Sequence, residues 1–125
     1  MEEKLGKVTI APNVLVTIVQ KTAASVPGVA KLCDSTPGVK RLLGLHTVGR
    51  GVEVNVLDGQ VMVDVYLVAR RGNDLLQMGL EVQRAIARAI EDIVGMEVRE
   101  ISVHVEDVAT ELTSTDDLPA RGKTG

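Results

Sequence analysis

The stretch GVEVNVLDGQVMVDVYLVA, residues 51–69, carries the clearest pattern in the chain. Apolar residues alternate with other residues on both sides of Asp58-Gly59, which is typical of two strands joined by a tight turn. An Asp-Gly pair favours a two-residue type I′ turn, because both turn positions need positive φ. This turn predicts three facing valine pairs on one apolar side of the hairpin: Val56 with Val61, Val54 with Val63, and Val52 with Val65.

The opposite side of the predicted hairpin is mixed in character. Glu53 faces Asp64 there, and Asn55 faces Met62. We expect this side to interact with other proteins, because partly apolar exposed faces mark association sites. The residues predicted to contribute are Glu53, Leu57, Met62, Asp64, Tyr66, Val68 and His104.

Two further segments have the apolar spacing of amphipathic helices. The first helix is predicted to begin near Pro12, a residue suited to the first helical position. In the second, Asp74 and Gln77 fit a capping box, and Gly95 is placed to end the helix. The predicted buried stripes are Leu15, Ile18, Val19 and Val26, with Thr22 as a polar break, and Leu75, Gly79, Val82, Ile86, Ala89, Ile90 and Ile93.

The remaining segments complete the expected fold. Residues 97–108 alternate like a half-buried strand, and residues 7–10 suit a first strand, whereas residues 29–50 indicate a long mobile connection with a short extended piece at 29–32. We predict an α+β two-layer sandwich, in which two helices cover one face of a three- to four-stranded, mainly antiparallel sheet. Residues 1–108 are expected to form a single domain, and residues 109–125 a flexible polar tail.

Composition limits the classes of function. The 125 residues carry a net charge of -3, and Tyr66 is their only aromatic residue, which disfavours a protein that stacks single-stranded bases. Cys33 is the only cysteine, so no internal disulfide and no cysteine-rich zinc site is possible. No secretory signal or apolar span is visible, so a cytoplasmic location is expected.

Two catalytic or binding alternatives remain open. A metal-dependent hydrolase would use Glu53, Asp64 and His104. Separately, His104 and Glu106 share one strand face, where they are expected to titrate as a pair or, with His46, to form a metal site. A nucleic-acid-associated module would use the basic residues Lys40, Arg41, Arg50, Arg70 and Arg71. Cys33 has little in its sequence surroundings to activate it, and a passive thiol is expected.

The order of the segments resembles the alkaline shock protein family of bacterial general and cell-envelope stress proteins. The matching pieces span about residues 5–108, with departures at Ser102, where members often carry Asn, and in the connection at 33–50. They are Gly28-Val29, the strand Val61–Val68 with Asp64, Gly72, the helical run Val82–Ile86, and the segment from Gly95 to Val105.

The resemblance implies a non-enzymatic cytoplasmic protein without catalytic residues. It also implies association with the inner face of the cell membrane through a partner rather than through a spanning segment. We therefore expect a stress-response protein that acts by self-association and by docking to a membrane-anchored protein. No cofactor, metal or small-molecule substrate is expected.

Overall fold

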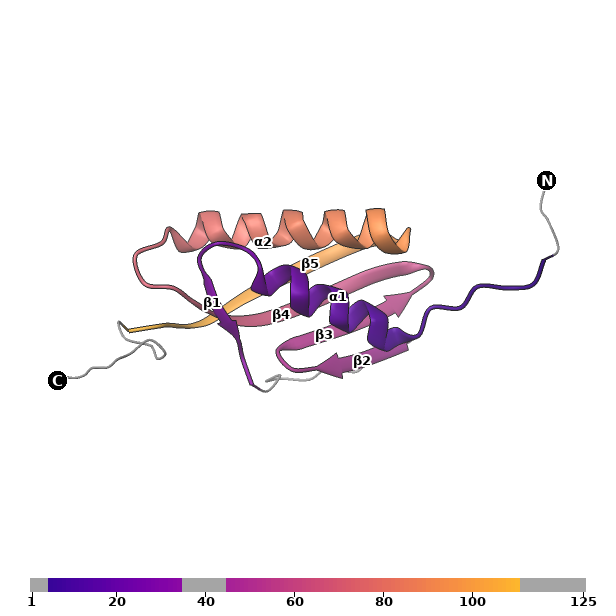
Figure 1. Ribbon diagram of the computed structural model, residues 1–125, viewed down its shortest axis with the longest axis horizontal. Helices are drawn as coiled ribbons and strands as arrows, with labels where there is room; N and C mark the ends of the chain where they lie inside the picture. Colours follow the sequence, from indigo (N-terminus) through magenta and orange to yellow (C-terminus); the bar gives the residue numbers. More distant parts are fainter. Residues whose placement is uncertain (1–4, 35–44, 111–125) are drawn as a thin grey trace.

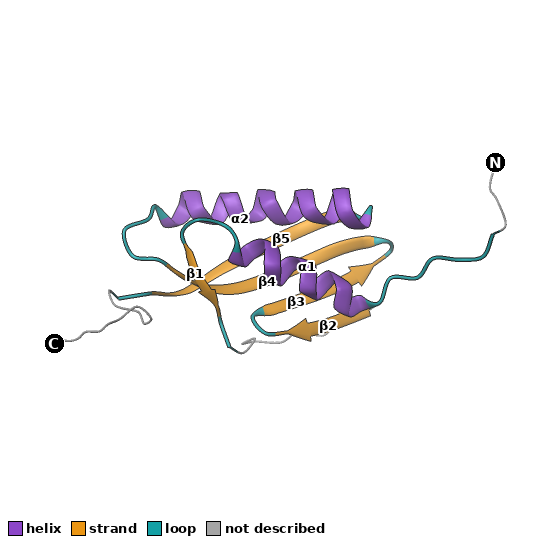
Figure 2. Ribbon diagram, viewed as in Figure 1, coloured by secondary structure: helices purple, strands orange, loops and turns teal. Residues whose placement is uncertain are grey.

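The computed structural model describes residues 5–34 and 45–110. Two helices lie on one face of a five-stranded sheet, which confirms the predicted two-layer α+β fold (Figures 1 and 2). The helices are α1 (Pro12–Ala24) and α2 (Leu75–Ala89), and a π-helical turn (Ile90–Val94) continues α2. The strands are β1 (Val29–Leu32), β2 (Leu45–Gly49), β3 (Val52–Leu57), β4 (Gln60–Ala69) and β5 (Glu97–Val108).

β4 is the central strand of the sheet. On one side it pairs with β3 along its first half and with β1 along its second half, and on the other side it pairs with β5. β2 extends the sheet beyond β3. Only the β4–β5 pair is parallel, so the sheet is mainly antiparallel, as predicted.

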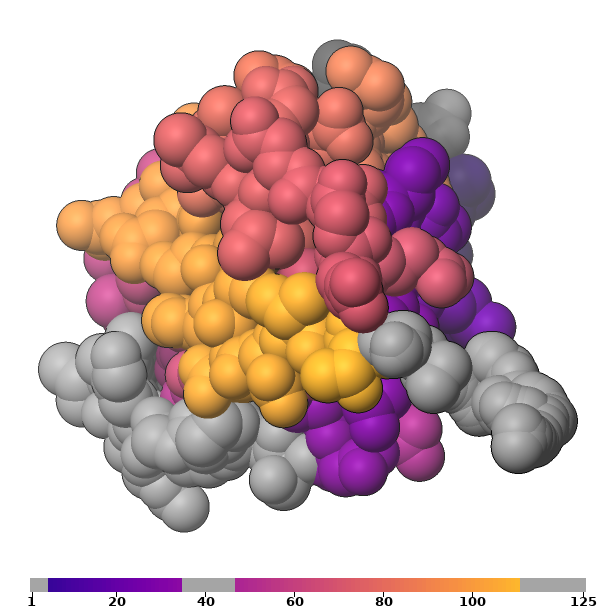
Figure 3. Space-filling model, turned by 90° about the vertical axis from the view of Figure 1, so that its left-hand side faces the viewer, coloured from indigo at the N-terminus to yellow at the C-terminus, as the bar shows by residue number. Residues whose placement is uncertain are grey.

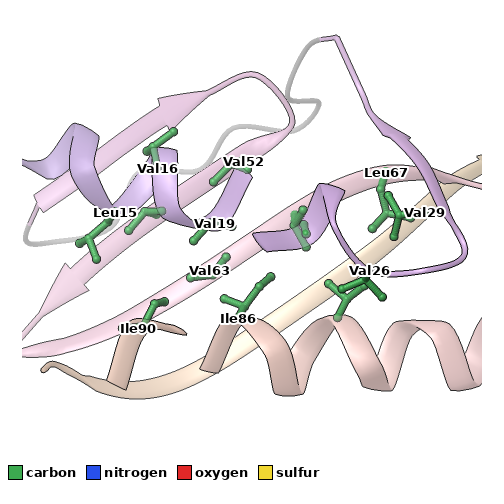
Figure 4. Packing of buried hydrophobic residues seen from close by; sticks show 14 of the residues in the cluster. Leu15, Val16, Val19, Val26, Val29, Val52, Val63, Leu67, Ile86 and Ile90 are labelled. Atoms are coloured by element: carbon green, nitrogen blue, oxygen red, sulfur yellow. The ribbon is translucent and has the colours of Figure 1, made fainter. Parts of the chain in front are cut away.

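The β3–β4 hairpin has the predicted register. Val52 pairs with Val65, Val54 with Val63 and Val56 with Val61. Asp58 and Gly59 have φ angles of 53° and 76°, which are the positive values that a type I′ turn requires. The alternation of strand side chains then directs these valines toward the helices, where they pack with Val19, Ile86 and Ile90 (Figure 4).

The two helices begin and end close to the predicted residues. Pro12 occupies the first turn of α1, and the Asp74 carboxylate accepts a hydrogen bond from the Gln77 N–H, as a helix N-cap does. Gly95 ends the π-helical turn in the left-handed conformation. Leu15 and Val19 are buried as expected. The core also contains Val16 and Ala23, whereas Ile18 and Thr22 are only half-buried.

The predicted stripe of α2 was partly wrong. Met78, Val82, Ile86 and Ile90 form the buried face at a spacing of four residues, whereas Leu75 is 38% and Ile93 69% exposed. Ile93 lies within the π-helical turn, where the spacing of side chains around the helix differs from that of an α-helix, so the predicted α-helical stripe does not extend to it. Met78, four residues before Val82, is buried in place of the predicted Gly79, which is only half-buried.

Two strand predictions also need correction. Residues 7–10 are irregular and exposed, because no strand in the described part of the chain pairs with them. The described parts of the predicted connection 29–50 contain two strands: β1, at the extended piece foreseen for 29–32, and β2, which was missed. β2 pairs with β3 along its whole length, from Leu45 opposite Val56 to Gly49 opposite Val52. The predicted tail lies outside the described residues from 111 onward.

Candidate interaction surfaces

The sheet face away from the helices, called here the far face, carries the residues that the hairpin pattern singled out. Glu53 pairs with Asp64, Asn55 with Met62 and Leu57 with Gln60. The parallel register of β5 adds His104, which lies beside Tyr66. Strand pairing therefore brings most of the predicted contact residues to one face, as expected.

Three of these side chains are in direct contact. His104 Nε2 lies 2.9 Å from Asp64 Oδ1, and the rings of Tyr66 and His104 stack with centroids 4.4 Å apart and an interplanar angle of 11°. An ionised carboxylate only accepts hydrogen bonds, so His104 donates from Nε2. The hydrogen-bond partner of His104 is Asp64, whereas the sequence had suggested Glu106 as its neighbour. Asp64 is the partner because the register places it beside this part of β5, whereas Glu106 lies at an irregularity of β5.

The far face is less exposed than predicted. Glu53 is fully buried, Asn55 is 3% exposed and Tyr66 is 6% exposed. Leu57, Met62, Asp64 and Val68 are half-buried. The His104 ring covers one side of Tyr66, so the tyrosine is part of the interior rather than a surface contact residue.

Tyr66 should ionise at higher pH in the folded protein than in the unfolded chain. Burial raises the pKa of its phenol above the usual value, and the nearby carboxylates of Asp64, Glu53 and Glu106 raise it further. The neutral phenol is therefore favoured by folding, and this contribution to stability is complete below about pH 10 and is lost as the pH rises through the folded-state pKa.

Because Tyr66 is the only aromatic residue, absorbance at the phenolate band reports this titration without interference. We expect a higher midpoint for native protein than for protein in denaturant. Equal midpoints would show that Tyr66 is exposed.

Among the described side chains, the residues of the metal alternative do not assemble into a site. Within residues 5–34 and 45–110, no three histidine, cysteine or acidic side chains lie close enough together to hold a metal ion. The contact between Asp64 and His104 brings together only two possible ligands, whereas metal sites in proteins usually have at least three protein ligands. The side chain of His46 lies outside the described set.

Cys33 has the surroundings of an unreactive thiol. It is half-buried, and its backbone N–H donates to the Tyr66 carbonyl over 2.9 Å. Burial raises the pKa of the Cys33 thiol, and the Glu106 carboxylate raises it further. A raised pKa lowers the thiolate fraction, which agrees with the predicted passive role.

The described basic residues of the nucleic-acid alternative lie just outside the strands. Arg50 is exposed between β2 and β3, and its carbonyl accepts a hydrogen bond from Gln20 Nε2. Arg70 and Arg71 are exposed where β4 ends. Lys40 and Arg41 lie outside the described residues.

A second surface, which the sequence pattern did not reveal, runs along α2 and β5. A groove between these elements is lined by Leu75, Leu76, Gly79, Leu80, Gln83, Val103 and Val105. Leu76 is 77% exposed, and Leu75, Leu80 and Val105 are each exposed by more than a third. Figure 3 shows β5 at the surface directly beside the start of α2. Leu76 and Leu80 were the available signal, because both are large apolar residues that fall outside the apolar stripe predicted for this helix.

The comparisons with known proteins identify the family. The profile of the alkaline shock protein 23 family, described as having a cell envelope-related function, matches residues 1–110. The chain therefore belongs to this family, as its sequence motifs indicated. It is 32% identical to the uncharacterized protein YqhY of Bacillus subtilis (strain 168) over 102 residues, which cover 81% of this chain and 76% of YqhY.

More distant matches agree with this assignment and with the fold. The uncharacterized protein Spy1535 of Streptococcus pyogenes serotype M6 is 26% identical over 122 residues, covering 93% of this chain and 89% of that protein. Among solved structures, MamM-CTD 215-293 superposes with a TM-score of 0.53 at 14% identity, covering 78% of this chain and 99% of that one. A zinc form of a MamM CTD gives a TM-score of 0.54 at 13% identity, covering 76% and 84%. At such low identity these two structures support the fold alone.

Neither α1 nor α2 combines the length and the apolar character that a helix needs to cross a bilayer.

Proposed function

We propose that this protein is a non-catalytic component of the cell-envelope stress response that acts by binding other proteins. One set of partners is further copies of itself, and another is a membrane-anchored protein that holds it at the inner face of the cell membrane. The family assignment supports the cell-envelope role. The observation that carries the binding role is the exposure of Leu75, Leu76 and Leu80 on one helix face. Grouped exposed apolar side chains of this kind mark sites of association.

The far face is our proposed docking site for the membrane-anchored partner, with fewer contact residues than the sequence predicted. Glu53 and Tyr66 are interior residues and serve as its support. The half-buried side chains of Met62 and Val68 supply apolar contact area, and Asp64 and His104 supply polar contacts. Leu57 extends the same face at the turn end of the hairpin. An interface with apolar and polar parts of this kind is typical of protein–protein contacts.

Affinity capture tests this proposal. Tagged full-length protein is used to capture partners from bacterial membranes solubilised with detergent, alongside the double variant Met62→Glu, Val68→Glu. We expect the wild-type protein to retain an integral membrane protein and the variant to retain at least tenfold less, because two buried carboxylates would lose hydration at the interface.

A matched control is Thr17→Glu, which adds a carboxylate at an exposed position of α1. It should capture as much partner as the wild-type protein. Circular dichroism establishes that all variants are folded. Equal capture by the double variant and the wild-type protein, or no membrane protein in either sample, would refute the far face as the docking site.

A further inference from the structure

β5 has one open edge. It pairs with β4 along one side, and within residues 5–34 and 45–110 no strand pairs with its other side. Edge strands present unpaired N–H and C=O groups and therefore form templates for pairing with another chain. This 12-residue strand therefore combines an open edge with a neighbouring apolar groove, and both are features of a site where another chain can pair.

The backbone hydrogen bonds show which residues of β5 point outward. The N–H and C=O of Tyr66 bond to Gly51 and Cys33 on the β3 and β1 side, so its odd-numbered neighbours in β4 point toward β5. In a parallel ladder with Val63 opposite Ile101, the even-numbered residues of β5 then bond to β4. Ile101, Val103 and Val105 consequently direct their backbone groups to the open edge.

The open segment is bounded at both ends. The register of β5 slips between Val98 and Glu100 and again between Val105 and Asp107, and such bulges interrupt strand pairing. Beyond the second bulge, the Val108 N–H bonds to the carboxylate of its neighbour Asp107. The regular open edge is therefore Glu100–Val105. Gln83 Nε2 donates to the Ile101 carbonyl, which has a second lone pair for a further donor.

We propose that a second copy of this chain pairs with this edge in antiparallel orientation, with Ser102 opposite Ser102 of the second copy. Residues that face each other across an antiparallel pair share one sheet face, so odd-numbered residues must oppose odd-numbered ones. The two registers with the longest overlap place either Ser102 or Val103 on the two-fold axis.

Charge separates these two registers. With Ser102 on the axis, Glu100 lies opposite His104 of the second copy, and the two-fold symmetry produces this pair twice. With Val103 on the axis, Glu100 approaches Glu106 of the second copy, and like charges directly opposite each other destabilise a strand pair. The register centred on Ser102 also makes Ile101 and Val103 a hydrogen-bonded pair, since both direct their backbone groups outward.

The apolar groove supports the same occupant. Both copies would join one continuous sheet, and their α2 helices would lie on the same face of it on either side of the two-fold axis. Leu76, Leu80 and Val105 of each copy then lie beside the new strand pair, where the second copy can cover them. This inference rests on the self-association named in the proposed function and specifies its surface and register.

Cysteine cross-linking tests the register. Full-length Ser102→Cys in a Cys33→Ser background carries one thiol per chain. In the proposed register the two thiols face each other at a non-hydrogen-bonded position, where Cα atoms lie roughly 4.5 Å apart, within the range that a disulfide spans. We expect mild oxidation to convert most of the protein to a disulfide-linked dimer. Glu97→Cys in the same background should remain at least tenfold less linked, because residue 97 lies far from its own copy in this register.

The outcomes are distinct. Linkage of Ser102→Cys alone supports the register, and Leu80→Glu added to it should reduce linkage at least tenfold by placing a carboxylate beside the apolar contact. Linkage at Val103→Cys but not at Ser102→Cys would overturn the register. A protein that is a dimer by light scattering but links at neither position would overturn the edge proposal while leaving self-association intact. A monomer at all concentrations would overturn both.

Discussion

Replacing Ile86 by alanine is expected to lower the free energy of unfolding by about 2–5 kcal/mol. Ile86 is fully buried at the centre of the helix–sheet interface, where Figure 4 places it between α2 and the hairpin valines. The change removes three buried carbon atoms and leaves a cavity that packed neighbours fill only partly. Urea unfolding followed by circular dichroism measures the loss as a lower midpoint.

Ile93→Ala is the matched control for Ile86→Ala. It makes the same chemical change seven residues along the chain, but Ile93 is 69% exposed. Its effect should stay within about 0.5 kcal/mol, as for most surface substitutions. Two equal effects would mean that Ile93 is in the core, as the sequence pattern indicated, and that the π-helical turn does not rotate it outward.

Replacing Gly51 by alanine is expected to lower the free energy of unfolding by about 2–4 kcal/mol. Gly51 has a φ of 68°, and a left-handed conformation costs a side-chain-bearing residue about 1–2 kcal/mol. An added Cβ would also lie 3.0 Å from two backbone oxygens, those of Cys33 and Tyr66. These oxygens belong to the junction of β1, β3 and β4, where the Cys33 N–H donates to the Tyr66 carbonyl, so they cannot move independently.

Gly59→Ala separates the two contributions. Gly59 also has a positive φ, of 76°, but nothing lies within 4 Å of a Cβ placed there. Chemical denaturation should therefore show a loss of about 1–2 kcal/mol for Gly59→Ala and a larger loss for Gly51→Ala. If Gly51→Ala is no more destabilising than Gly59→Ala, the three strands do not approach one another closely at Gly51.

The hairpin was predictable from the sequence because all of its determinants are local. Asp58-Gly59 specifies the turn, the turn sets the register, and the alternation of valines identifies the buried side. The same logic located the capped start of α2 at Asp74. These are features in which a few neighbouring residues decide the conformation.

The missed features depend on contacts between distant residues. β2 is short and flanked by glycine, and only its pairing with β3 makes it a strand. The partner of His104 depends on the parallel register of β5, which brings Asp64 within hydrogen-bond distance across 40 positions of sequence. The same register stacks His104 on Tyr66 and removes that ring from the surface.

The candidate surfaces changed for a related reason. Alternation correctly assigned Tyr66 and Glu53 to the far face, but a face is not the same as an exposed surface. Conversely, the leucines at the start of α2 were assigned in part to the core, and the structure exposes them. Burial is a property of the assembled layers, so the periodicity of one segment cannot determine it.

Light scattering of the purified full-length chain most directly tests whether this protein acts by association with copies of itself. One copy has a mass of 13.3 kDa. At micromolar concentrations we expect a mass of at least two copies, because a second copy should cover the apolar groove and the open edge of β5. A mass of one copy that persists up to about a hundred micromolar would contradict self-association, since dissociation constants weaker than about 0.1 mM correspond to less than roughly 5.5 kcal/mol of binding free energy.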